Sequence, residues 1–385
     1  MSLFDELRVP ETWLTAGYRD GTAVLSGTRV LATGLEPGDE EVLVAEGLAR
    51  DVGGGVLVCE GPEIRPSGGR TVIHYDMTGQ CRDGHAHVVF DPVVPFPMTT
   101  FAAQQLVTAV IDPDGTWRPP ASADASDLAA FIQPEMWTVV PVLSATLWAA
   151  SAAGYGVREA MDWLASDQLG QIAAYCRSLA GPNPLPLLES VQALVNGPAP
   201  ARQQAVYLAW QALAPAEANI RNTPGSQRLD LDGWLSAQAV LAISLPPGAE
   251  VADEQIVAAL LAAAHEFLRQ RNAGDLGSVW RDTQPPRKWN AHWGVFTRRA
   301  LIIASQPARF RDWAGAGIAH DLLLGQQAHA ESLAVARCPQ AAQPGQVILV
   351  KRGVTELLSA PAQMRGGTFG PGRGTDSGAS TTDRS

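Results

Sequence analysis

One stretch near the N-terminus constrains the fold more than any other part of the sequence. Residues 28–60 read TRVLATGLEPGDEEVLVAEGLARDVGGGVLVCE. An apolar run, a glycine turn, a helix-forming segment, a second glycine turn and another apolar run follow one another. Two apolar runs joined through a helix are typical of neighbouring parallel strands. The stretch therefore predicts a strand–helix–strand unit of an α/β fold.

The chain after this unit changes character twice. Apolar runs at 69–75 and 86–92 predict two more short strands. The next part, to about residue 225, is rich in alanine and leucine, with apolar residues spaced as on one face of a helix. Short apolar runs then alternate again with a helix-forming segment at 252–271. The order is α/β, then all-α, then α/β.

This order predicts an α/β core with a mainly parallel sheet, interrupted by an inserted all-α subdomain. We expect the N-terminal half of the core at 1–99, the inserted domain at 100–225, and the C-terminal half at 226–363. The tail at 364–385 is rich in Gly, Ser and Thr without apolar spacing, so we expect it to be disordered. Hydrophobic residues make up 46% of the chain, enough for a large core.

Composition also limits partners and location. The net charge of -11 argues against tight non-specific binding to nucleic acid, which requires lysine and arginine to neutralise phosphates. The chain starts without the basic and apolar regions of a secretory signal, so we expect a cytoplasmic protein. Contact with the inner face of the membrane stays open. The uncharged segment 136–156 contains Pro141 and many small residues, which favours a buried helix over a membrane span.

The glycine turn after the first apolar run is the main candidate site. A phosphate-binding loop presents backbone N–H groups and a helix N-terminus to the phosphates, and a lysine followed by Ser or Thr completes it. Gly34 and Gly38 can form the turn, but Asp39 stands at the lysine position and Glu40 or Glu41 at the magnesium position. Each carboxylate about 5 Å from a phosphate charge costs roughly 3 kcal/mol at an effective dielectric near 20. We interpret the turn as a degenerate nucleotide loop. Its carboxylates stabilise the start of the helix through their interaction with the helix dipole.

Several segments, taken in order, resemble the cytosolic part of type IV secretion coupling proteins, the TraG/TraD-type conjugative DNA-transfer ATPases. The segment 30–50 resembles the family's Walker A strand, loop and helix. The segment 142–166 resembles the paired helices of its all-alpha domain. The strand-forming LIIASQPARFRDWAG resembles the strand that ends in the sensor glutamine, here Gln306. The resemblance extends over about residues 28–363.

The resemblance implies a RecA-like P-loop-NTPase-type core that carries an all-alpha domain. The family's motor hexamerises around DNA and hydrolyses ATP, and its all-alpha domain recognises relaxosome or secretion-substrate proteins. Its Walker B strand ends in Asp-Glu, with the Asp ordering magnesium and the Glu activating water. The best counterpart here is Asp282, followed by Thr283, so the glutamate is absent.

The leading hypothesis is therefore a catalytically degenerate coupling-protein-like subunit with no catalytic residue, metal or cofactor. It would bind an active coupling-ATPase paralogue, relaxosome or secretion-substrate proteins within a homo- or hetero-oligomer. One alternative is an active ATPase of conjugative DNA transfer that uses ATP and magnesium through a shifted loop or a neighbour's residues. Another is a structural protein of a mobile element without a DNA role.

Two other groups of residues have simpler interpretations. His74, His85 and His87 with Cys81 could ligate a metal, but histidines at a strand edge are more common. Tryptophans between 280 and 313 alternate with arginine and lysine, a pattern that can stack on single-stranded nucleic acid. Packing of the tryptophans within the protein is the favoured interpretation, and contact with DNA remains an alternative.

Overall fold

The structure is a computed structural model in which the regular elements of the chain are described. The described residues are 14–27, 29–50, 55–59, 70–78, 87–111, 134–180, 186–245, 251–271, 276–282, 299–304, 321–325, 342–351 and 354–361. The predicted tail, Gln306, Cys81 and His85 lie outside these ranges.

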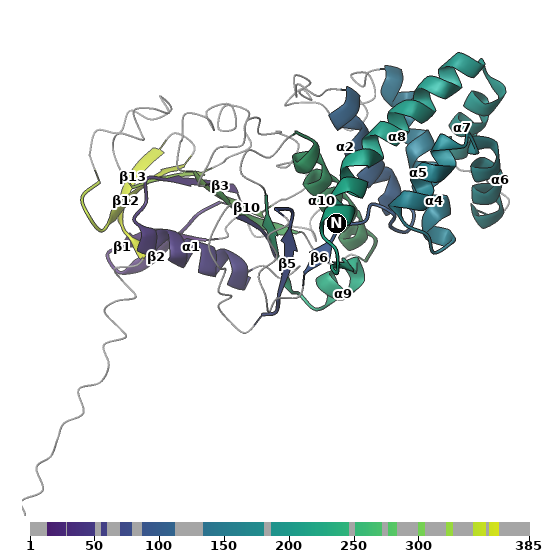
Figure 1. The fold of residues 1–385 in the computed structure, drawn as a ribbon. Helices are drawn as coiled ribbons and strands as arrows, with labels where there is room; N and C mark the ends of the chain where they lie inside the picture. The colour runs from purple at the N-terminus through teal and green to yellow at the C-terminus, as the bar shows by residue number, and fades with distance from the viewer. Residues whose placement is uncertain are drawn as a thin grey trace, which may run out of the picture.

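One sheet of eleven strands forms the core of the fold (Figure 1). Its strands are adjacent in the order β2-β1-β13-β12-β11-β3-β10-β9-β4-β8-β5. The run from β11 to β5 is parallel throughout, whereas β12, β13, β1 and β2 are antiparallel to their neighbours. The strands are β1 (Thr15–Arg19), β2 (Thr22–Leu25), β3 (Arg29–Thr33), β4 (Gly55–Cys59), β5 (Val72–Asp76), β8 (Val240–Ser244), β9 (Gly277–Asp282), β10 (Arg299–Ala304), β11 (Asp321–Leu324), β12 (Gln346–Lys351) and β13 (Val354–Ser359).

The sequence predicted a mainly parallel sheet, and the observed sheet is mixed. Asp20 and Gly21 join β1 to β2, both with positive φ (49° and 75°), and two residues separate β12 from β13. Two-residue connections join only antiparallel strands, because parallel neighbours require a longer crossover. Short connections therefore account for the antiparallel pairs β1–β2 and β12–β13, whereas β1–β13 and β11–β12 pair strands that are far apart in the sequence. The parallel part follows from crossovers such as α1.

The two faces of the sheet bury different side chains. Successive residues of a strand point to opposite faces, so Val30 and Leu31 of β3 belong to different buried clusters. Val30 packs in the cluster that contains Leu43 of α1 (Pro37–Arg50), and this helix lies against β9 and β10 (Figure 1). Leu31 packs in the larger cluster, which continues into the helical part of the molecule.

Every element described between residues 98 and 222 is a helix (right of Figure 1). The helices are α2 (Met98–Ile111), α4 (Pro134–Ala152), α5 (Val157–Ala165), α6 (Leu169–Ala180), α7 (Pro186–Asn196) and α8 (Ala199–Asn222). α4 contacts α2, α5, α6, α7 and α8, and it buries Val142, Leu143 and Leu147 completely. The prediction of a buried helix in this segment is confirmed. None of the described helices is long and apolar enough to cross a bilayer.

α10 (Val251–Arg271) leads from β8 to β9 and packs along α2. All residues from 254 to 264 are buried, including the polar Glu254 and Gln255. A helix that is buried on every side has an apolar surface all round rather than one stripe. This explains why the alanine- and leucine-rich sequence of α10 lacks a polar face over this length.

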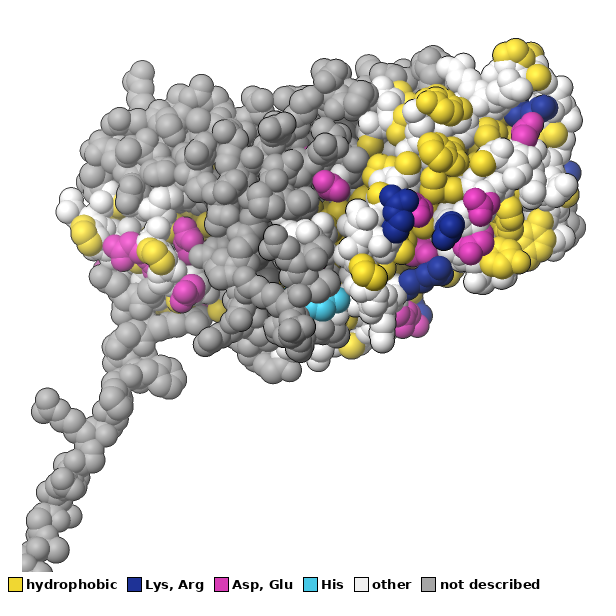
Figure 2. Space-filling view, viewed as in Figure 1, with side chains coloured by type: hydrophobic (Ala, Val, Ile, Leu, Met, Phe, Trp, Pro, Cys, Tyr) yellow, Lys and Arg dark blue, Asp and Glu magenta, His cyan; other side chains and the backbone are white. Residues whose placement is uncertain are grey.

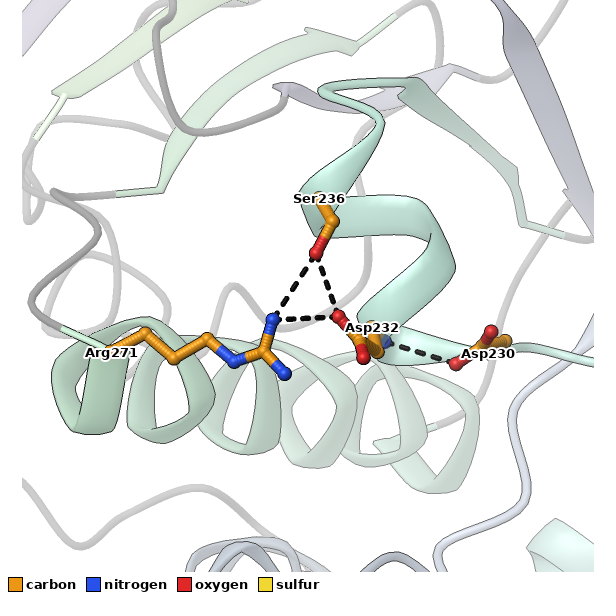
Figure 3. Close-up of polar contacts among 4 residues, drawn as sticks. All are labelled: Asp230, Asp232, Ser236 and Arg271. Carbon is orange, nitrogen blue, oxygen red and sulfur yellow. Dashed lines mark hydrogen bonds and ion pairs between the residues drawn. The ribbon is translucent and has the colours of Figure 1, made fainter.

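An exposed polar network joins the end of α10 to α9 (Leu231–Ser236), the helix that precedes β8 (Figure 3). The Arg271 Nη1 donates to Asp232 Oδ1 at 2.7 Å and to Ser236 Oγ at 3.2 Å. Asp230 caps α9 by accepting the Asp232 N–H at 3.1 Å. These charges are exposed to water, so the network fixes the position of α9 more than it stabilises the fold.

An ion pair between a buried aspartate and a largely exposed arginine connects the sheet side of the molecule to the helices. Two short parallel strands, β6 (Val88–Val89) and β7 (Gln227–Arg228), bring Asp91 within 3.2 Å of the Arg228 Nε. Burial raises the pKa of Asp91, while the N–H of Val93 and the charge of Arg228 act in the opposite direction. A Cβ on Gly156, just before α5, would overlap the guanidinium of Arg228, so a larger residue there would require the arginine side chain to move away from its position beside Asp91.

We expect Arg228→Met to destabilise the fold more at pH 7.5 than at pH 5. The variant leaves Asp91 buried without its cation, which should lower the free energy of unfolding by roughly 1–3 kcal/mol at pH 7.5. The pKa of Asp91 is already raised in the folded state, so this carboxyl favours folding at low pH and loses that contribution as pH rises through the folded pKa. Without Arg228 the pKa rises further, and protonation at pH 5 removes part of the cost. Urea unfolding at both pH values measures the difference.

Arg271→Met is the matched control, because it removes an arginine from an exposed carboxylate. Hydrogen bonds from Ser236 and Arg271 lower the pKa of Asp232, so this group stays ionised at both pH values. A smaller loss without pH dependence is expected. An equal loss for Arg228→Met at pH 5 and pH 7.5 would contradict the assignment of this ion pair.

Candidate functional site

The predicted site residues that the structure describes lie along the carboxyl edge of the parallel strands. Thr33 of β3 pairs with Ala304 of β10, and Ala304 pairs on its other side with Asp282 of β9. Leu324 of β11 completes this row beside Thr33. Neighbouring strands lie about 4.8 Å apart, so the Cα atoms of Thr33 and Asp282 are separated by roughly 10 Å. The fold therefore places the backbone of Asp282 at the same edge as the turn that starts at Gly34.

The path of the chain marks β3 as the point where the strand order reverses. The crossover from β3 to β4 passes β10 and β9 on one side, and α1 contacts both of these strands. The crossover from β10 to β11 passes β3 in the opposite direction. Ligands of open α/β sheets bind at the carboxyl edge beside such a reversal. The turn after β3 thus occupies the position where a ligand site is expected from topology.

The turn itself is short. Only Gly34, Leu35 and Glu36 separate β3 from Pro37, the first residue of α1. Gly34 has φ +64°, a conformation that favours glycine, and proline is well suited to a first helical position. Gly38 was predicted to be the second glycine of a loop, but it lies within the first turn of α1. Gly34 alone gives the turn its shape.

Two backbone N–H groups at the start of α1 are bonded to the residue that precedes the helix. The N–H groups of Asp39 and Glu40 both donate to the carbonyl oxygen of Glu36, at 2.9 and 3.1 Å. Asp39 is only 3% exposed, so the residue at the lysine position is folded into the protein. Acidic side chains in a first helical turn are favoured by the helix dipole. The described geometry is that of a capped helix start.

The end of β11 closes one side of the turn. The Gly325 N–H donates to the Thr33 carbonyl oxygen at 3.0 Å. A Cβ on Gly325 would lie 2.0 Å from the Gly34 oxygen and 2.8 Å from the Leu35 Cα. The two backbones are therefore in direct contact, with no room for a side chain between them. The sequence analysis missed Gly325, and a glycine directly after an apolar run was the only signal for it.

The described lysine cannot supply the missing cation. Lys351 Nζ lies 3.6 Å from Asp321 Oδ2, and Asp321 begins β11 at the opposite edge of the sheet. That carboxylate also accepts the N–H of Gly27. Four residues of β11 span roughly 10 Å between the two edges. Lys288, the other lysine of the chain, lies outside the described residues.

The remaining candidates are only partly placed. Gln306 follows the last residue of β10 by two positions in the sequence and lies outside the described ranges. His74 and His87 form an isolated parallel bridge, with ring centroids 6.3 Å apart. The described part of the chain contains no group of three metal-ligating side chains. Of the tryptophans considered for nucleic-acid stacking, the structure places only the backbone of Trp280, in β9.

Comparison with solved structures identifies the fold. The chain is similar to the bacterial conjugative coupling protein TrwBdeltaN70 in its unbound monoclinic form, with 12% sequence identity, a TM-score of 0.52, and 92% of this chain and 89% of that chain covered. It is also similar to the trigonal form of TrwBdeltaN70 in complex with sulphate, with 12% identity, a TM-score of 0.50, and coverage of 87% and 86%. No protein-family model and no curated protein matches the sequence. The resemblance to coupling proteins is confirmed as a likeness of fold.

We expect Gly325→Ala to destabilise the protein by roughly 1–3 kcal/mol, because its methyl group must displace the turn at Gly34. Gly170→Ala is the matched control. Gly170 lies in α6, and its nearest neighbour, Val195 Cγ1, would be 3.8 Å from a new Cβ. Alanine there should stabilise the helix by about 0.5–1 kcal/mol. Chemical denaturation of both variants measures the contrast, and equal stabilities would show that the backbones are not in contact.

Proposed function

We propose that the chain is a coupling-protein-like subunit of a conjugative, type IV secretion DNA-transfer system, and that it does not hydrolyse ATP itself. One observation carries the proposal: a coupling-protein fold is combined with a turn after β3 that does not suit a triphosphate. The fold likeness extends over 92% of the chain. The turn has three residues, and the N–H groups of Asp39 and Glu40 are bonded to Glu36.

The chemistry of the turn supports the absence of hydrolysis. Catalysis of phosphoryl transfer depends almost entirely on positioning and on cations that neutralise the phosphates. The lysine position is occupied by the buried Asp39, and the side chains of Glu36 and Glu40 are exposed or partly exposed at the turn. Backbone contact with Gly325 leaves no space for the loop to open on that side. The triphosphate would therefore be repelled at the position where a phosphate-binding loop normally attracts it.

A subunit of this kind would act through partners. The chain has the parallel strands and the helices of a coupling-protein fold. It could therefore form the surfaces through which a coupling protein assembles. We infer assembly with an active coupling-ATPase paralogue, or presentation of the helical part to relaxosome or secretion-substrate proteins. In this proposal the chain has a RecA-like core and a separate all-alpha domain. It forms a homo- or hetero-oligomer and contacts DNA.

We expect the purified protein not to bind magnesium–ATP with a Kd below about 1 mM, which corresponds to roughly -4 kcal/mol. Titration calorimetry with ATP and magnesium measures this directly, and magnesium chloride without nucleotide is the control. The Glu36→Gln, Glu40→Gln double variant should bind more tightly than the parent, because it removes two charges that repel the triphosphate from side chains that are exposed or partly exposed. Saturable micromolar binding by the parent protein, with hydrolysis, would contradict the proposal.

We expect deletion of the gene to lower transfer of the resident conjugative element at least about tenfold in the host that carries it. Complementation with the parent gene should restore transfer. Complementation with Asp39→Asn should restore it equally, because the side chain takes no part in turnover. Unchanged transfer after deletion would favour a structural protein of the mobile element without a DNA role. Failure of Asp39→Asn in a folded protein would favour catalysis at the turn.

A second candidate function, an active ATPase, is favoured by one specific observation. Thr33, Ala304 and Asp282 share one row across the sheet, so the edge keeps the strand positions that a hydrolytic site needs. An ATPase on this edge would require magnesium at Asp282 and a cation from outside the turn, for example from a neighbouring subunit. The calorimetric titration separates the two candidates, since only the ATPase predicts saturable nucleotide binding.

A further inference from the structure

A pocket of about 720 Å³ lies between the end of β5 and the helices. One face of α8, from Trp210 to the C-cap residue Thr223, forms most of its wall. Met77 after β5, Val110 of α2 and Asp253 of α10 line it from the other sides. The pocket therefore lies where segments of four elements, far apart in the sequence, meet.

A proline in this wall leaves one backbone acceptor without its usual donor. Pro215 lies inside α8 and lines the pocket. In a regular helix the N–H of residue 215 would donate to the carbonyl oxygen of Gln211, but proline has no N–H. Gln211 also lines the pocket, so its carbonyl oxygen can accept a hydrogen bond from a bound molecule.

A buried phenol fixes the amide of Asn219, two turns further along the same wall. Tyr75 of β5 is completely buried, and its hydroxyl donates to Asn219 Oδ1 at 2.9 Å. Burial raises the pKa of this phenol well above its ordinary value, while the N–H of Phe90 acts in the opposite direction. The hydroxyl therefore keeps its proton and uses it on Asn219. Since Asn219 accepts through its oxygen, its Nδ2 is the donor that it can offer to a molecule in the pocket.

The stretch of α8 between these two polar groups is apolar and small. Ala214, Pro215 and Ala218 line the pocket there, so another chain can approach the helix closely. Gln211 and Asn219 are eight residues apart, roughly 12 Å along the helix axis. Four residues of an extended chain span about 13 Å. This face of α8 therefore has the length and the end groups to bind an extended peptide backbone through both an N–H and a C=O.

An exposed indole forms one end of this wall. Trp210 lines the pocket and is 36% exposed. One turn earlier, Tyr207 is 58% exposed, and its hydroxyl accepts Gln211 Nε2 at 2.7 Å. Figure 2 shows hydrophobic side chains gathered along the α8 side of the helical part. An apolar side chain in the pocket would leave water for contact with Trp210, Met77 and Val110, which favours binding.

We propose that this pocket binds an extended segment of a partner protein that carries an uncharged apolar side chain such as leucine. The apolar side chain packs against Trp210, an N–H of the segment donates to the Gln211 carbonyl oxygen, and a C=O accepts from Asn219 Nδ2. A helical segment cannot make these bonds, because its own backbone groups are bonded to one another. The inference rests on the proposed function in taking the partner to be a protein. β5 lies five strands from β3, roughly 24 Å away, so this site does not depend on nucleotide binding at the turn.

The test uses the full chain labelled with 5-fluorotryptophan. The Trp210 fluorine resonance is identified by its loss in Trp210→Phe, and two peptides are titrated without nucleotide, acetyl-GSGALAGSG-amide and the same peptide with alanine in place of leucine. We expect the leucine peptide to shift the Trp210 resonance saturably. Its affinity should be about tenfold or more above that of the alanine peptide, because leucine buries three more carbon atoms. A short oligodeoxythymidine, the probe for nucleic acid, should produce no saturable shift.

Asn219→Asp tests the donor. Aspartate has nearly the same shape and still accepts the Tyr75 hydroxyl, but it lacks the N–H groups, so the affinity for the leucine peptide should fall about three- to tenfold. Asn196→Asp is the matched control. Asn196 lies in α7, and its Oδ1 likewise accepts a hydrogen bond, from Gln192 Nε2 at 2.9 Å. This control should bind the leucine peptide as the parent protein does.

Pro215→Ala tests the acceptor. Alanine restores the N–H that bonds to the Gln211 carbonyl oxygen within the helix. The variant should therefore resist chemical denaturation better than the parent protein, yet bind the leucine peptide several-fold more weakly. Pro141→Ala is the matched control, because it also replaces a proline inside a helix, in α4, and should leave the affinity for the peptide unchanged.

Equal affinity for the two peptides, no saturable shift of Trp210 by the leucine peptide, or a saturable shift by oligodeoxythymidine would overturn the proposal. Unchanged affinity in Asn219→Asp or in Pro215→Ala would overturn it as well. Where one of these variants does not fold, the other variant and the peptide preference of the parent protein decide. None of these measurements involves ATP or conjugative transfer, so failure here is distinguishable from failure of the proposed function.

Discussion

The backbone contact between Gly325 and the turn at Gly34 determines what the carboxyl edge of the sheet can hold. Because β11 and β3 are parallel neighbours about 4.8 Å apart, their ends leave the sheet side by side. Glycine at both ends lets the chains touch, and the Gly325 N–H bonds to Thr33. Three residues lie between β3 and α1, and Asp39 in the first turn of α1 is buried. The properties of the candidate site follow from this packing.

The rest of the molecule is organised around the same sheet. Val30 and Leu31 lie on opposite faces of β3 and pack in two separate hydrophobic clusters. The larger cluster, which contains Leu31, continues into the helices. α10 is buried on every side where it packs along α2, so it connects sheet and helices through apolar contact. The Asp91–Arg228 pair adds a polar connection between β6, β7 and the start of α5. The helical part is therefore coupled to the sheet by both packing and charge.

Local patterns predicted most of the elements, because periodicity and glycine turns are encoded within a few residues. Helical spacing of apolar residues was predicted for the part before residue 225, and Val157, Met161 and Leu164 form such a buried stripe in α5. The apolar runs predicted at 69–75 and 86–92 contain the strands β5 and β6. Contacts between distant segments could not be predicted in this way. Gly325 touches Gly34 across nearly three hundred residues of chain, and Tyr75 holds Asn219 across more than one hundred. The mixed sheet and the exposed Trp210 likewise depend on tertiary neighbours, which no single stretch of sequence specifies.

The turn after β3 lies at the carboxyl edge of the parallel strands, where open α/β sheets commonly bind ligands. Glu36 is exposed there and Glu40 is partly exposed, whereas Asp39 is buried. Negative charge at this position disfavours triphosphates and nucleic-acid backbones. The same topology that commonly creates a phosphate site is thus poorly suited to phosphate when the charges at its strand ends are reversed. The overall charge of -11 acts in the same direction at long range.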